Sequence, residues 1–133
     1  MSVNLDLVRS IYAAWERGDF SSGEWAHAEI EWVRMDGPSP GTWTGPAELA
    51  EVTRDFLSAW EDWRVEAEEY RELDDERVLA LVQTSGRGKT SGLDIEQVMN
   101  RAAHLFHIRD GKVARMASYW NRDRALADLG LAE

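Results

Sequence analysis

The chain has 133 residues and no cysteine, so it offers neither a disulfide nor a thiolate ligand for a metal. No apolar run approaches the roughly 20 residues that a bilayer-spanning helix needs. The first residues lack the basic start and apolar segment that are typical of a signal peptide. These absences favour a cytoplasmic protein with no membrane partner.

Positive charge is also scarce. The 15 lysines and arginines are outnumbered by 25 aspartates and glutamates, which gives a formal net charge of −10. Such a surface repels phosphate backbones, so we expect no nucleic-acid partner. The length fits one domain over residues 1–133. Tryptophan, by contrast, is abundant with seven residues, and either the core is unusually aromatic or a flat compound binds among them.

Helical periodicity occurs twice in the first half of the chain. It predicts an amphipathic helix over residues 4–17, with Asn4 as its N-cap and Gly18 after its end. A second helix begins at Pro46 and is expected to end between residues 61 and 63. Its apolar stripe consists of Leu49, Val52, Phe56 and Trp60. Between the helices we expect a short helical turn at residues 23–27, a strand at 30–35 and a loop at 36–41.

From residue 65 onward the apolar pattern has a period of two, which indicates strands. The predicted strands are Val65–Leu73, Arg77–Ser85, Leu93–Ile108 and Lys112–Asn121. Turn formers at 74–76 and 110–111 join neighbouring strands as hairpins, and a short helix is expected at 123–130. This order predicts an α+β fold in which helices pack on one face of a curved antiparallel sheet. A cavity between the two layers is the natural place for a functional site.

Two histidines lie in the third of these strands. Alternation places His104, Phe106 and Ile108 on one face, while His107 points to the other. The two imidazoles therefore diverge and do not form a metal pair. We expect neither a metal nor another cofactor.

Several short motifs resemble the nuclear transport factor 2-like superfamily, in particular its SnoaL-like polyketide cyclase and steroid isomerase branch. They are "IYAAWERGD" from Ile11, Glu31-Trp32, "GTWTG" from Gly41, Ser91-Gly92, "HLFHIRDGKVAR" from His104 and "YWNRDRALADLGL" from Tyr119. The resemblance implies a cone-shaped, curved antiparallel sheet, mixed at its edge, that packs on the N-terminal helices and encloses a pocket. It also implies a homodimer. The family includes cofactor-free isomerases, cyclases and epoxide hydrolases beside members without catalysis, so the fold alone decides no function.

The residues that carry chemistry in this family are only partly present. The carboxylate positions of steroid isomerases correspond to Trp32 and to the pair at 103–104, so that chemistry is not expected. Polyketide cyclases place an aspartate seven residues before the glycine of the "DGK" turn, and that position is His104. Their last-strand histidine corresponds to Met116, and the epoxide hydrolase positions on the first strand are Trp32 and Arg34.

The resemblance and the residues together suggest a site. His104 is the candidate acid/base, since its ordinary pKa lies near neutrality. The alternatives are that His104 lines the cavity and binds a ligand, or that it only supports the structure. Arg34 is the second candidate catalytic residue and stabilises a carboxylate or enolate, unless it forms an ion pair with Glu69. The predicted ligand-binding residues are Tyr12, Trp15, Trp32, Trp60, Phe106, Met116 and Trp120. The expected partner is a small hydrophobic molecule that is planar or cyclic. The protein either isomerises or cyclises this molecule, or binds it without turnover. The third alternative is a dimeric scaffold with a filled interior.

Overall fold

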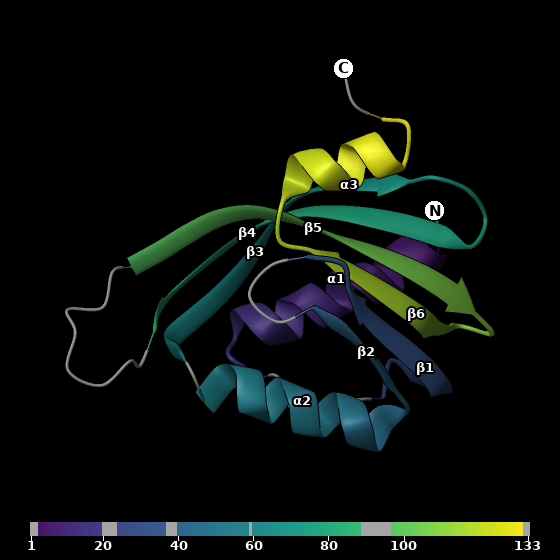
Figure 1. The fold of residues 1–133 in the computed structure, drawn as a ribbon. Helices are drawn as coiled ribbons and strands as arrows, with labels where there is room; N and C mark the ends of the chain where they lie inside the picture. The colour runs from purple at the N-terminus through teal and green to yellow at the C-terminus, as the bar shows by residue number, and fades with distance from the viewer. Residues whose placement is uncertain (1–2, 20–23, 37–39, 59, 89–96, 132–133) are drawn as a thin grey trace.

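The computed structural model describes residues 3–19, 24–36, 40–58, 60–88 and 97–131. These residues form one six-stranded sheet and three helices (Figure 1). The elements in chain order are α1 (Val3–Glu16), β1 (Ala26–Arg34), β2 (Gly41–Thr44), α2 (Pro46–Ser58), β3 (Trp60–Glu72), β4 (Arg77–Gly88), β5 (Gln97–Arg109), β6 (Lys112–Tyr119) and α3 (Arg122–Asp128). The predicted α+β class is confirmed.

The sheet is open, with the strand order β2-β1-β6-β5-β4-β3. Strands β3 to β6 form the predicted antiparallel meander, and β1 pairs with β6 in parallel. Asp110 and Gly111 form the two-residue turn between β5 and β6, with φ of 55° and 75°. A turn of this kind needs positive φ at both positions, and aspartate followed by glycine is one of the pairs that supply it.

The pairing of β5 with β6 contains a bulge. Ile108 pairs with Val113, but His107 pairs with Arg115, so Ala114 is an extra residue in β6. The bulge shifts the alternation of side chains along the rest of the strand. As a result Met116 and Ser118 lie opposite Phe106 and His104.

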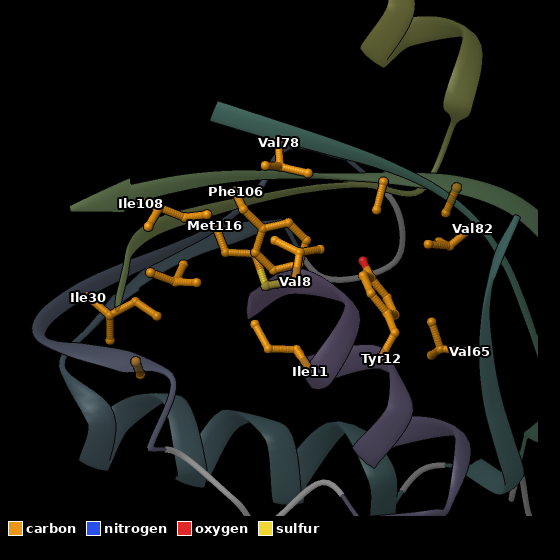
Figure 2. Packing of buried hydrophobic residues seen from close by; sticks show 14 residues of the cluster. Val8, Ile11, Tyr12, Ile30, Val65, Val78, Val82, Phe106, Ile108 and Met116 are labelled. Atoms are coloured by element: carbon orange, nitrogen blue, oxygen red, sulfur yellow. The ribbon is translucent and has the colours of Figure 1, made fainter. Parts of the chain in front are cut away.

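The two faces of the sheet are covered by different helices, as Figure 1 shows. We call the face that packs against α1 and α2 the inner face, and the face under α3 the outer face. On the inner face, Val8, Ile11 and Tyr12 of α1 pack against apolar side chains of the strands (Figure 2). The outer-face cluster consists of Leu79, Leu81, Ala103, Leu105, Ala117, Tyr119 and Ala125, the last from α3.

Several details differ from the sequence predictions. Asn4 lies within α1, where its side-chain amide donates a hydrogen bond to the carbonyl of Asp75, and does not cap the helix. The expected turn at 23–27 is replaced, over its described part, by a turn at 24–25 and the start of β1. The strand β2 was not predicted, and α2 ends at Ser58, so Trp60 belongs to β3. Residues 93–96 of the expected third strand lie outside the described residues.

Among the described residues, no helix is both long and apolar enough to cross a membrane.

Candidate functional site

A cavity of about 140 Å³ lies between the inner face of the sheet and the helices α1 and α2. Its walls are mostly apolar and aromatic, which is typical of small-molecule sites. A cavity of roughly 150 Å³ lined by apolar side chains accepts a benzene ring. Six of the predicted site residues contribute to its lining: Trp15, Trp32, Arg34, His104, Met116 and Trp120.

The three other predicted site residues lie outside this lining. Tyr12 and Phe106 are each 0% exposed and belong to the inner core. Trp60 packs instead against two tryptophans of the cavity wall, with ring centroids 5.0 Å from Trp63 and 6.4 Å from Trp120. Tyr12 nevertheless contributes to the site, because its hydroxyl group forms a hydrogen bond with His104.

His104 projects from β5 into the inner layer, as the alternation of its strand predicts. Its Nδ1 lies 2.6 Å from the hydroxyl oxygen of Tyr12. In Figure 2 the Tyr12 ring rises from α1 with this oxygen directed toward the strands. Two further rings enclose the imidazole, with centroids 6.2 Å (Trp15) and 6.4 Å (Phe106) away in edge-to-face geometry. The imidazole is thus fixed by one hydrogen bond and two ring contacts.

The hydrogen bond to Tyr12 determines which nitrogen of His104 carries the proton. Burial raises the pKa of Tyr12 well above its ordinary value, so the phenol stays protonated. A buried hydroxyl needs an acceptor, and within the described part of the chain the acceptor in reach is Nδ1. We therefore assign the Tyr12 hydroxyl as the donor to Nδ1, which places the ring proton on Nε2. His104 lines the cavity and Tyr12 does not, so we assign Nε2, on the ring edge away from Tyr12, to the cavity side.

Burial also lowers the pKa of His104 from 6.5 to about 4. The surrounding rings and the core replace the water that would stabilise an imidazolium. At neutral pH His104 is therefore an uncharged ring. It can donate its Nε2 hydrogen to a ligand oxygen, and its lowered pKa makes it a weaker base than a free imidazole.

Arg34 occupies the end of β1, two residues after Trp32 on the same face. Its Cζ lies 4.6 Å from the ring centroid of Trp32 and 4.9 Å from those of Trp43 and Phe56. The expected alternative, an ion pair with Glu69, is not formed, because Glu69 pairs with Arg71. Burial lowers the pKa of Arg34 from its ordinary value, and its Nη2 is buried without a hydrogen-bond partner in the described structure.

His104 and Arg34 stand in one row across the sheet. Both are register partners of Ser118, His104 from β5 and Arg34 from β1, with β6 between them. Since neighbouring strands lie about 4.8 Å apart, their Cα atoms are separated by roughly 10 Å. A molecule the width of one ring fits between an imidazole and a guanidinium placed in this way.

A family model described as the SnoaL-like domain matches residues 8–116, which is most of the chain. The chain belongs to the SnoaL-like domain family. This confirms the resemblance that the sequence motifs indicated. No curated protein matches the sequence of this SnoaL-like protein.

Solved structures with the same fold cover nearly the whole SnoaL-like chain. An NTF2-like protein of unknown function from Burkholderia pseudomallei has a TM-score of 0.79 at 20% identity, over 96% of this chain and 97% of that one. The protein TerC, co-crystallised with polyporic acid, has a TM-score of 0.76 at 22% identity, over 98% of both chains. A candidate polyketide cyclase from Xanthomonas campestris pv. campestris has a TM-score of 0.71 at 21% identity, over 94% of this chain and 95% of that one. At these identities the similarity establishes the fold.

The polar residues of the cavity wall in the SnoaL-like protein that were missed from the sequence are Asp36, Thr53, Thr84, Ser118 and Tyr119. The hydroxyl of Ser118 accepts a hydrogen bond from the indole nitrogen of Trp32 at 2.7 Å. Ser118 lies two residues after Met116, and this spacing could have predicted that both face the cavity. Alternation counted from the turn at 110–111 gives the wrong face, however, because it does not include the bulge at Ala114. Asp36 also lines the cavity, yet its carboxylate accepts from the backbone nitrogens of Trp120 at 2.6 Å and Asn121 at 3.3 Å. Asp36 therefore holds the two residues that follow β6 in place.

Metal-ligating side chains do not converge anywhere in the described part of the SnoaL-like protein. The cavity instead offers an imidazole, a guanidinium and a hydroxyl within aromatic walls. These groups can donate hydrogen bonds to oxygen atoms of a ligand and can move a proton at one of them.

Proposed function

We propose that this SnoaL-like protein binds a small, planar or cyclic carbonyl compound in the cavity and exchanges a proton with it through His104. The observation that carries the proposal is the Tyr12–His104 pair, which leaves one imidazole nitrogen for the cavity. The reaction class is cofactor-free proton transfer, as in an isomerisation or a cyclisation. The cavity size and its indole and phenyl walls support a ligand with a flat ring.

The Tyr12 hydroxyl allows His104 to act in both directions. While Tyr12 donates to Nδ1, Nε2 presents a proton to the carbonyl oxygen of the ligand. When the ring proton shifts to Nδ1 and Nδ1 donates to the Tyr12 oxygen, the Tyr12 hydroxyl loses its acceptor, and Nε2 presents a lone pair that accepts a proton from carbon or oxygen. When His104 removes a proton from the carbon next to the carbonyl, negative charge develops on the ligand oxygen and Arg34 stabilises it; the return of the proton from His104 to the ligand discharges it.

Hydrogen–deuterium exchange tests this function without knowledge of the natural substrate. Cyclohexanone and β-tetralone are incubated with the protein in deuterium oxide, and NMR records the loss of protons next to the carbonyl. We expect the wild-type chain to accelerate exchange over buffer and His104→Gln to lose that acceleration while it still binds the ketone. The variant His107→Gln is the matched control, because His107 lies on the outer face and exchange should persist in it.

A second function is favoured by the low basicity of His104, whose pKa is lowered to about 4. A weak base of this kind suits a protein that binds a carbonyl compound and does not turn it over. Binding without accelerated exchange would support this alternative. If neither ketone binds and tryptophan emission stays unchanged with both, the proposed binding of a carbonyl compound is wrong.

A further inference from the structure

The guanidinium of Arg34 lies among three aromatic rings, which we call the aromatic cage. The three rings come from three elements: Trp32 from β1, Trp43 from β2 and Phe56 from α2. Cages of this type recognise quaternary ammonium groups through the negative faces of the rings. Trp32 and Phe56 also line the cavity, whereas Trp43 lies behind the guanidinium and is not part of the lining.

The sequence of β2 makes room for this cage. Gly41 is the register partner of Arg34, and it carries no side chain. A Cβ atom at Gly41 would lie 3.0 Å from the Cη2 atom of the Trp43 ring. The glycine therefore permits Trp43 to lie beside the guanidinium.

The guanidinium has no counter-charge within the described residues. None of the ion pairs found there involves Arg34, and its Nη2 is buried without a partner. The carboxylate of Asp36 shares the cavity wall but is taken by two backbone nitrogens. A cation that is partly removed from water and lacks an anion is costly, and a bound anion relieves that cost.

From this arrangement we infer that Arg34 sets the charge selectivity of the cavity. It selects flat ring compounds that already carry an anionic oxygen pair, such as an aryl carboxylate, and excludes amines that the same three rings would otherwise hold. A carboxylate matches the planar fork of a guanidinium and accepts two hydrogen bonds from it. A second oxygen on the far side of the ring would face Ser118 and His104, which continue the row from Arg34. This inference rests on the proposed binding function and adds the chemical class of the ligand.

Three probes of nearly equal shape test the inference on the full-length wild-type chain. They are benzoate, its uncharged isostere benzamide, and phenyltrimethylammonium, with binding followed by calorimetry and tryptophan emission. We expect benzoate to bind about tenfold or more tightly than benzamide, because hydrogen bonds between charged groups are worth more than neutral ones. Phenyltrimethylammonium should not bind.

Variants of Arg34 then reverse the order. Arg34→Met keeps a long side chain in the cage without charge, so it should lose the preference for benzoate over benzamide. Arg34→Ala empties the cage, so it should gain binding of phenyltrimethylammonium. The matched control is Arg115→Met, because Arg115 lies outside the cavity lining, in a pair with Glu31.

The outcomes separate this inference from the proposed function. If wild-type protein binds benzamide as tightly as benzoate, the inference is wrong while cavity binding stands. Binding of phenyltrimethylammonium by wild type would also overturn it. If none of the probes and neither ketone binds, both proposals fail together. The relative affinities of the three probes for the wild-type chain decide the inference by themselves, even if a variant does not fold.

Discussion

Lowering the pH from 6.5 to about 4 should destabilise the folded chain through His104. Burial lowers the pKa of this residue to about 4 in the folded state, while its ordinary value of 6.5 applies to the unfolded chain. Between these values the unfolded chain binds a proton that the folded chain does not. The free energy of unfolding therefore falls as the pH falls through this window. Above and below it both states hold the same number of protons at this site, so the contribution of His104 is constant.

The size of the effect follows from the difference between the two pKa values. The difference of 6.5 − 4 is about 2.5 pKa units, and each unit corresponds to 1.36 kcal/mol, so His104 costs the folded state about 3 kcal/mol at the acid end. Domains of this kind are typically stable by roughly 5–15 kcal/mol. A loss of this size is therefore a large part of the total and is easily measured.

Urea unfolding followed by tryptophan emission measures this loss for wild type, His104→Gln and His107→Gln. The glutamine at position 104 does not titrate, and its side-chain oxygen can still accept the hydroxyl of Tyr12. We expect the stability of His104→Gln to fall less than that of wild type across the window. The control removes a half-buried histidine on the outer face whose pKa is also lowered, first of all by burial. We expect the stability of His107→Gln to follow that of wild type more closely than His104→Gln does.

Two results would refute the reasoning. One is a parallel loss of stability in wild type and His104→Gln as the pH falls. The other is an NMR titration in which the His104 ring protonates near its ordinary pKa of 6.5. Either result would mean that water reaches the imidazole and that burial does not hold it neutral.

Two further predictions concern the framework of the site. Arg122, which is 7% exposed, donates to the carbonyls of Val82 at 2.7 Å and Ala102 at 3.3 Å and pairs with Glu68. Arg122→Met should therefore lower stability by about 2–3 kcal/mol in urea unfolding, and an unchanged midpoint would contradict the importance of these bonds. Gly111 has a φ of 75°. Gly111→Ala should cost about 1–2 kcal/mol in the same assay, and a stabilised variant would show that the turn relaxes without strain.

The sequence predicted those features that depend on local alternation. His104 and Phe106 lie on the inner face and Leu105 on the outer one, as a period of two requires. The turn at Asp110 and Gly111 followed from the backbone freedom of these two residue types. The long strands were predictable because each contains enough residues for the period to be recognised.

Features that depend on tertiary contacts were not predictable. Trp60 continues the spacing of Phe56 in α2, but the helix ends at Ser58, and Trp60 begins β3, where it pairs with Gly88 of β4. The four residues of β2 are too few for a periodic signal, and their hydrogen bonds come from β1. The surroundings of Arg34 depend on three elements that meet only in the folded chain, so no local pattern could tell an aromatic cage from an ion pair.

The bulge at Ala114 decides which side chains of β6 face the cavity. If the same strand paired in step from the turn, Arg115 and Ala117 would lie opposite Phe106 and His104, where Met116 and Ser118 now lie. The extra residue therefore keeps a cation out of the chamber and supplies it with a hydroxyl. One irregular step of the backbone thus sets the polarity of this wall.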